Sequence, residues 1–248
     1  MLRLLLVTAH PDDEAGGFGG TLLLYRRRGV QTFVICLTPG QAARNRGTTH
    51  SDNELAAVRR EEFARACKLL EVTQGEVLNF PDSKLDRTDF YSMVEQITRR
   101  VREIRPHVML SFGPEGAITA HVDHSMASLV ATAAFHWSSR NNRFPEQLQN
   151  GLQPWRAQKL YYSMWPGTLP DRPPVSMPPW TAEIQIGDFA ERKLAAFKAH
   201  TTQNPLYELF SQRVMRFGPR ELFHLAATSE PCEMTRETDL FSGVVEQD

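Results

Sequence analysis

The chain is poor in cysteine, which limits the class of protein it can belong to. Its 248 residues include only three cysteines, Cys36, Cys67 and Cys232, and no Cys-x-x-Cys pair. An odd number of widely spaced cysteines favours reduced thiols over a disulfide framework, so we expect a cytoplasmic protein. Cys36 and Cys67 fall in apolar segments, and we therefore expect core packing for them rather than a thiol nucleophile.

The sequence also lacks an excess of charge of either sign and any long apolar run. Lys and Arg total 28 against 29 for Asp and Glu, so no strong field attracts nucleic acid or an anionic membrane surface. The apolar start at residues 1–7 is too short to span a bilayer and has no cleavage-type site, so we interpret it as a first strand. We expect a small-molecule partner, no nucleic acid and no membrane, and leave a homo-oligomer open.

Apolar strand patterns alternate with helical ones along much of the chain. A hydrophobic content of 41% over this length is enough for one domain with a sizeable core, spanning residues 1–248. Such alternation predicts an α/β fold, a Rossmann-like, doubly wound, mostly parallel sheet with helices on both faces. The expected strands are 2–8, 32–38, 76–80 and 108–112, and the expected helices are 21–28, 53–70, 89–104, 126–138 and 194–200.

The segment at about 145–180 breaks this alternation. It contains eight of the sixteen prolines and a cluster of aromatic residues, and we interpret it as an irregular insertion. Long ordered loops beside a site are often lids or oligomer contacts, although a loop that packs on the sheet edge explains the pattern equally well.

Two short polar motifs follow predicted strands. In His10-Pro11-Asp12-Asp13 the proline stiffens the turn, so His10 and Asp13 can present two metal ligands on one side while Asp12 stays close as a base. His121-Val122-Asp123-His124 offers two more imidazoles, of which one can ligate while the other faces a substrate. Ligands bind outside the carboxyl ends of strands in open α/β sheets, so the two motifs together predict a metal site there.

The glycine-rich run Gly16-Gly17-Phe18-Gly19-Gly20 invites a different reading, a phosphate-binding turn. However, the Gly-x-Gly-x-x-Gly spacing is absent, and two acidic residues occupy the turn itself, where they would repel a pyrophosphate. We expect these glycines to allow close packing of a helix against the sheet.

Several ordered segments resemble the LmbE-like (PIG-L) family of zinc-dependent deacetylases that act on N-acetylglucosaminyl compounds. The segments cover most of the chain, and their order is far more specific than any one of them. They are Ala9-His10-Pro11-Asp12-Asp13-Glu14, Arg59-Arg60-Glu61-Glu62-Phe63 with Ala66 and Leu70, Phe80-Pro81-Asp82-Ser83, Pro114-Glu115-Gly116 leading to His121-Val122-Asp123-His124, and the Lys193, His200 and Gln203 pattern of residues 192–203.

The resemblance implies roles for individual residues. It makes His10, Asp13 and His124 the ligands of one Zn²⁺ per chain, with Fe²⁺ as the alternative ion. Asp12 becomes the general base, and His121 the partner of the oxyanion. The remaining implied roles are sugar-hydroxyl contacts for Arg59 and Asp82, and support of the ligands or pocket for Asp123 and His200. Glu14 could likewise orient a ligand, or it could simply favour a helix N-terminus.

Three positions depart from the family pattern: Val122 replaces a proline, Ala120 replaces a glycine, and Thr119 lies where one branch has a tyrosine. These changes bear on substrate and rate more than on metal binding. The expected function is removal of the N-acetyl group from an N-acetylglucosamine-containing small molecule by attack of a metal-bound water. The alternatives are an amidase of the same site acting on a bulkier amide, such as a thiol conjugate, and a non-catalytic Rossmann-like binding module.

Overall fold

The computed structural model describes residues 1–169 and 173–247, and these build one mixed sheet between two layers of helices. The strands are β1 (Arg3–Thr8), β2 (Gln31–Cys36), β3 (Gln74–Val77), β4 (Val108–Ser111), β5 (Lys159–Met164), β6 (Ala182–Gln185) and β7 (Arg220–Thr228). The α-helices are α1 (Asp13–Arg27), α2 (Asp52–Leu69), α3 (Phe90–Ile104), α4 (Val122–Trp137), α5 (Pro145–Gln149), α6 (Phe189–Lys198) and α7 (Tyr207–Phe217), with 3-10 turns η1 (Leu85–Arg87), η2 (Ala117–Thr119) and η3 (Thr201–Leu206).

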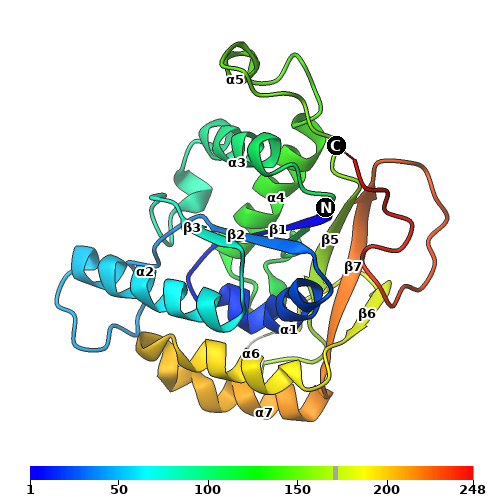
Figure 1. Ribbon diagram of the computed structural model, residues 1–248. Coiled ribbons are helices and arrows are strands. Elements are labelled where there is room, and N and C mark those ends of the chain that lie inside the picture. The colour runs from blue at the N-terminus through cyan, green and yellow to red at the C-terminus, as the bar shows by residue number, and fades with distance from the viewer. Residues whose placement is uncertain (170–172, 248) are drawn as a thin grey trace.

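The strand order is β3-β2-β1-β4-β5-β7-β6. Neighbouring strands from β3 to β5 pair in parallel, and β7 runs antiparallel to both β5 and β6. Helices α3 and α4 cover one face, whereas α1, α2, α6 and α7 cover the other (Figure 1). The predicted α/β fold, a doubly wound, mostly parallel sheet with helices on both faces, is therefore confirmed.

The buried core follows from the apolar runs that predicted the central strands. Leu4, Leu5, Leu6 and Val7 of β1 are fully buried, as expected for a strand covered on both faces. Cys36 and Cys67 are also buried, and burial raises the pKa of the Cys36 thiol well above its ordinary value. This agrees with the predicted core role of these two cysteines. No helix in the described part of the chain is both long and apolar enough to cross a bilayer.

The first helix begins much earlier than its apolar pattern indicates, at Asp13 instead of residue 21. The glycine run therefore lies inside α1, where glycine has low helix propensity, and the pattern alone misses it. A Cβ atom at Gly20 would lie 2.4 Å from the side chain of Ile186, which follows β6. The predicted close packing is thus the role that the structure gives to Gly20.

The interpretation of residues 145–180 as irregular is wrong for its middle part. Lys159–Met164 forms β5, which pairs with β4 and β7 in the interior of the sheet. The short helix α5 also lies in this range, whereas residues 170–172 lie outside the described residues. The flanking prolines argue against a strand in the sequence, and the strand depends on its burial between β4 and β7.

Candidate metal centre

Both polar motifs lie at one edge of the sheet. The turn that contains His10 follows β1, and His121 is the N-cap residue of α4, which follows β4 through η2. Strands β1 and β4 are direct parallel neighbours, so their carboxyl ends meet at this edge. The strand order brings together two motifs that are more than 100 residues apart, as the sequence predicts.

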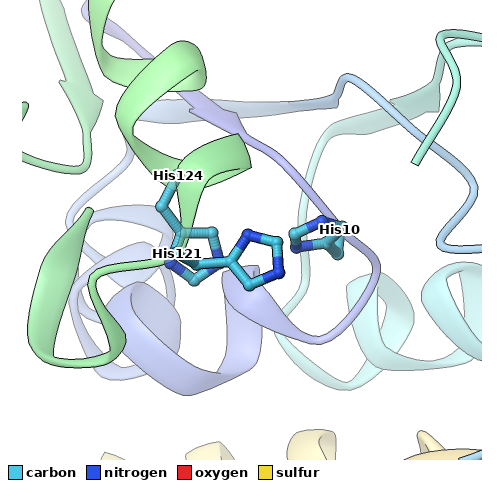
Figure 2. A group of neighbouring side chains, drawn as sticks. All are labelled: His10, His121 and His124. Carbon is cyan, nitrogen blue, oxygen red and sulfur yellow. The ribbon is translucent and has the colours of Figure 1, made fainter. Parts of the chain in front are cut away.

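Three imidazoles gather at this edge. Figure 2 shows His10, from the turn after β1, facing His121 and His124 from the start of α4. The ring centroids lie 4.8 Å apart for His10 and His121, 5.3 Å for His10 and His124, and 5.1 Å for His121 and His124. One ring nitrogen of each lies within 4.8 Å of the others. Three converging nitrogen donors can hold a divalent cation.

Asp13 lies between two of these imidazoles. Its Oδ1 is 3.1 Å from Nε2 of His124, and its Oδ2 is 3.6 Å from Nδ1 of His10. The backbone N–H of His10 also donates to Oδ2. Burial raises the pKa of Asp13, but His124 and His10 outweigh burial and bring the pKa well below its ordinary value. Asp13 is therefore a carboxylate in contact with both histidines.

Two further carboxylates face the other nitrogen of His10. Its Nε2 lies 3.1 Å from Asp82 Oδ1 and 3.2 Å from Asp123 Oδ2. Each of these carboxylates is held by backbone donors, Asp82 by the N–H of Ala42 and Asp123 by the N–H of Ser83. A carboxylate behind a histidine fixes the ring orientation and directs the opposite nitrogen toward a metal. The predicted sugar contact of Asp82 stays a prediction, since the contact that the structure shows is with His10.

The Asp12 side chain contacts an arginine, whereas the Asp13 side chain contacts two histidines. Its Oδ2 accepts a 2.9 Å hydrogen bond from Arg59 Nη2. Arg59 is almost fully buried and also donates to the backbone carbonyls of Pro11 and Gly40, so its predicted sugar contact likewise stays a prediction. Burial raises the pKa of Asp12 from 3.8 to about 6, against the opposing charge of Arg59. A carboxylate with a pKa near neutrality can accept and return a proton at physiological pH.

His121 has its own hydrogen-bonding constraint. Its Nδ1 accepts from the backbone N–H of Asp123 at the start of α4, which leaves the ring proton on Nε2. Burial lowers the pKa of His121, and the nearby His10 and His124 lower it further, which favours the neutral form of the ring. A neutral imidazole with an Nε2–H is a hydrogen-bond donor suited to a developing oxyanion.

Phe112 was not predicted to belong to the site, yet its ring stacks on His124 with a centroid distance of 4.1 Å and an interplanar angle of 12°. Its only sequence signal is its place as the last apolar residue of the run that contains β4. Glu14 and His200 were predicted to support the site, and the structure brings them into contact at 2.6 Å although they are 186 positions apart.

The donor set fits a divalent cation. Histidine nitrogens and a carboxylate oxygen are common ligands of Zn²⁺ and Fe²⁺, and His10, Asp13, His121 and His124 supply both types within one small cluster. Because a catalytic site needs an open position, three of these four side chains are enough as ligands.

Comparison with known proteins places these residues in a family. The sequence model of PIG-L, described as GlcNAc-PI de-N-acetylase, matches residues 5–135, which include both motifs. The 1D-myo-inositol 2-acetamido-2-deoxy-alpha-D-glucopyranoside deacetylase of Streptomyces avermitilis is 28% identical, over 98% of this chain and 97% of that protein. The mycothiol S-conjugate amidase of Streptomyces coelicolor is 24% identical, also over 98% and 97%.

Structural comparison gives the same fold. The solved N,N'-diacetylchitobiose deacetylase of Pyrococcus horikoshii superposes with a TM-score of 0.74 and 24% identity, covering 90% of this chain and 83% of that one. The PIG-L match spans more than half of the chain and contains its histidine and aspartate cluster. The chain therefore belongs to the PIG-L (LmbE-like) family.

Proposed function

We propose that the protein is a metal-dependent hydrolase that removes the N-acetyl group from an N-acetylglucosamine-containing small molecule. The observation that carries the proposal is a cluster of Asp13 and three histidines that has a second carboxyl group, that of Asp12, directly beside it in the chain. The deacetylase relative from Streptomyces avermitilis, similar over nearly the whole chain, supports this reaction and substrate class.

The contacts of the cluster indicate which side chains would hold the cation. His10, Asp13 and His124 would hold the cation, because Asp13 touches both histidines and Asp82 and Asp123 orient His10. We propose Zn²⁺, one per chain, with Fe²⁺ as the alternative. When bound, the cation would polarise the amide carbonyl and make a nearby water molecule more acidic.

The residues of the chain carry the proton transfers. Asp12 accepts a proton from a water molecule while the oxygen of that water molecule bonds to the carbonyl carbon. The neutral His121 donates a hydrogen bond from its Nε2–H to the carbonyl oxygen as negative charge develops there. Asp12 then passes its proton to the amide nitrogen as the C–N bond breaks, and the products are acetate and a free amine.

A second candidate is an amidase that uses the same site on a bulkier amide. The similarity to mycothiol S-conjugate amidase favours it, and the reacting groups would be the same. A non-catalytic binding module has no need of a base with a pKa near neutrality, so we do not favour it.

Replacement of the base tests the proposal. Asp12→Asn should lower the rate of amine release by about 100- to 10,000-fold, because the amide cannot accept the proton. Free-amine release is measured over N-acetylated sugars and thiol conjugates, together with metal content. Asp52→Asn, at a largely exposed aspartate in α2, is the matched control and should leave both unchanged. Full activity of Asp12→Asn, or no amine released by the metal-loaded wild type, would contradict the proposed function.

A further inference from the structure

The backbone at Asp12 is unusual for a residue with a side chain. Its φ is 121° and its ψ is −28°, a region that costs non-glycine residues about 1–3 kcal/mol. Asp12 is also the N-cap residue of α1, yet its side chain caps no backbone N–H and bonds Arg59 instead. An aspartate normally stabilises a helix start by capping it. Other contacts must therefore hold this conformation.

Glu14 supplies one of these contacts. It is fully buried, and its Oε2 accepts a 3.0 Å hydrogen bond from the backbone N–H of Asp12. This bond fixes the peptide plane that precedes the Asp12 side chain. Arg59 holds the Asp12 carboxylate on the other side, so the strained residue is held at both its backbone and its side chain.

His200 in turn fixes Glu14. It is fully buried, and its Nε2 donates to Glu14 Oε1 at 2.6 Å, while no partner of its Nδ1 is found among the described residues. His200 follows α6, and the next two residues, Thr201 and Thr202, donate to the buried Glu62 of α2. The support of Asp12 thus extends to two helices on one face of the sheet.

We propose that Glu14 and His200 are a positioning pair that holds the strained backbone of Asp12 and so aims its carboxylate at the reacting water. The proposal rests on the proposed function, because it assigns these residues to the base of that reaction. Neither side chain touches the substrate or transfers a proton in it. A misplaced catalytic group lowers turnover and leaves ground-state binding largely intact.

Two substitutions at Glu14 separate this role from simple burial. Glu14→Gln keeps an oxygen that accepts the Asp12 N–H, and its kcat should stay within about threefold of wild type. Glu14→Met has similar length but accepts no such bond, and its kcat should fall by about 10- to 100-fold, with KM and metal content little changed. Equal kcat for the two variants, or loss of metal from Glu14→Met, would overturn the proposal.

A double-mutant cycle with Asp12 distinguishes positioning of the base from a general structural role of Glu14. In an Asp12→Asn background the Glu14→Met change should cost no further activity, because the group that it positions no longer acts. An equal loss in both backgrounds would overturn the proposal. If Glu14→Met does not fold, His200→Leu replaces it in the same cycle, since it removes the donor that fixes Glu14.

Crystal structures of the variants test the positioning role without an activity assay. In Glu14→Met, Asp12 should leave the positive φ region or separate from Arg59, whereas Glu14→Gln should keep both features. Retention of both in Glu14→Met would overturn the proposal even if the enzyme acts on another substrate. Conversely, a displaced Asp12 in a protein that hydrolyses no amide would count against the proposed function alone.

Discussion

At the scale of single residues, Asp12 combines a strained backbone with a carboxyl group of shifted pKa. The strain predicts that a glycine variant at this position is more stable than an alanine variant, the reverse of the usual order within a helix. Asp12→Gly should be more stable than Asp12→Ala by about 1 kcal/mol, because glycine tolerates positive φ without a Cβ clash. Urea unfolding of both variants measures the difference. At Asp52, in the first turn of α2, the order should reverse, and the same order at both positions would contradict the prediction.

As the proposed general base, Asp12 should determine the acid side of the pH profile through its pKa. The base must be ionised to accept a proton, so activity should rise with pH through the pKa of Asp12, which is about 6 without a bound cation. A bound divalent cation favours the carboxylate further, so the midpoint of kcat/KM should lie at or below pH 6.

Substitution of Arg59 tests whether the acid side of the pH profile reports the pKa of Asp12. Its charge lowers the pKa of Asp12, so Arg59→Gln should move the midpoint to higher pH, whereas Arg59→Lys keeps the charge and should move it less. The measurement is kcat/KM against pH for the three proteins. A midpoint that does not move in Arg59→Gln would mean that a different group controls the acid side of the profile.

At the scale of helices and strands, the connection from α4 to α5 depends on one buried arginine of α3. The Arg102 guanidinium donates to four backbone carbonyls and one side-chain oxygen, those of Ser138, Arg140, Arg143, Phe144 and Gln147. Arg102→Met would remove all five of these hydrogen bonds from a mostly buried site, so the free energy of unfolding should fall by about 3 kcal/mol.

This loss should affect stability alone, because Arg102 lies outside the site. Urea unfolding measures the change, and kcat per folded molecule should match wild type. Arg87→Met is the matched control, since the Arg87 side chain is 82% exposed, and should change stability by less than about 0.5 kcal/mol. Equal effects of the two substitutions would show that the carbonyl contacts contribute nothing.

The elements of the first half of the chain could be predicted, and several of the second half could not. Helix α3 was expected at 89–104 and runs over Phe90–Ile104, because its apolar residues recur at the helical period along one face. Strand β5 was missed, since its apolar residues are flanked by prolines and carry no period of their own. Helix α7 and strand β7, at Tyr207–Phe217 and Arg220–Thr228, were also missed.

At the scale of the whole molecule, the cluster of His10, Asp13 and His124 joins the β1 turn to α4. A cation bound there stabilises the folded state by mass action, by about 2.7 kcal/mol at a free concentration 100 times the Kd. Addition of Zn²⁺ to metal-free protein should therefore raise the melting temperature. Asp12→Asn should keep this increase and His10→Ala should lose it, and an equal increase in both would place the cation elsewhere.

The fold class, the two motifs and the residue types of the site could be predicted from the sequence alone, because apolar periodicity and short stiff turns are local properties. The side-chain contacts required the tertiary structure. Only the strand order places Asp82 and Asp123 behind His10, and only the packing of α6 brings His200 to Glu14. The different pKa values of Asp12 and Asp13 also depend on the tertiary structure. Burial raises the pKa of Asp12 to about 6, whereas His124 and His10 outweigh burial at Asp13 and lower its pKa.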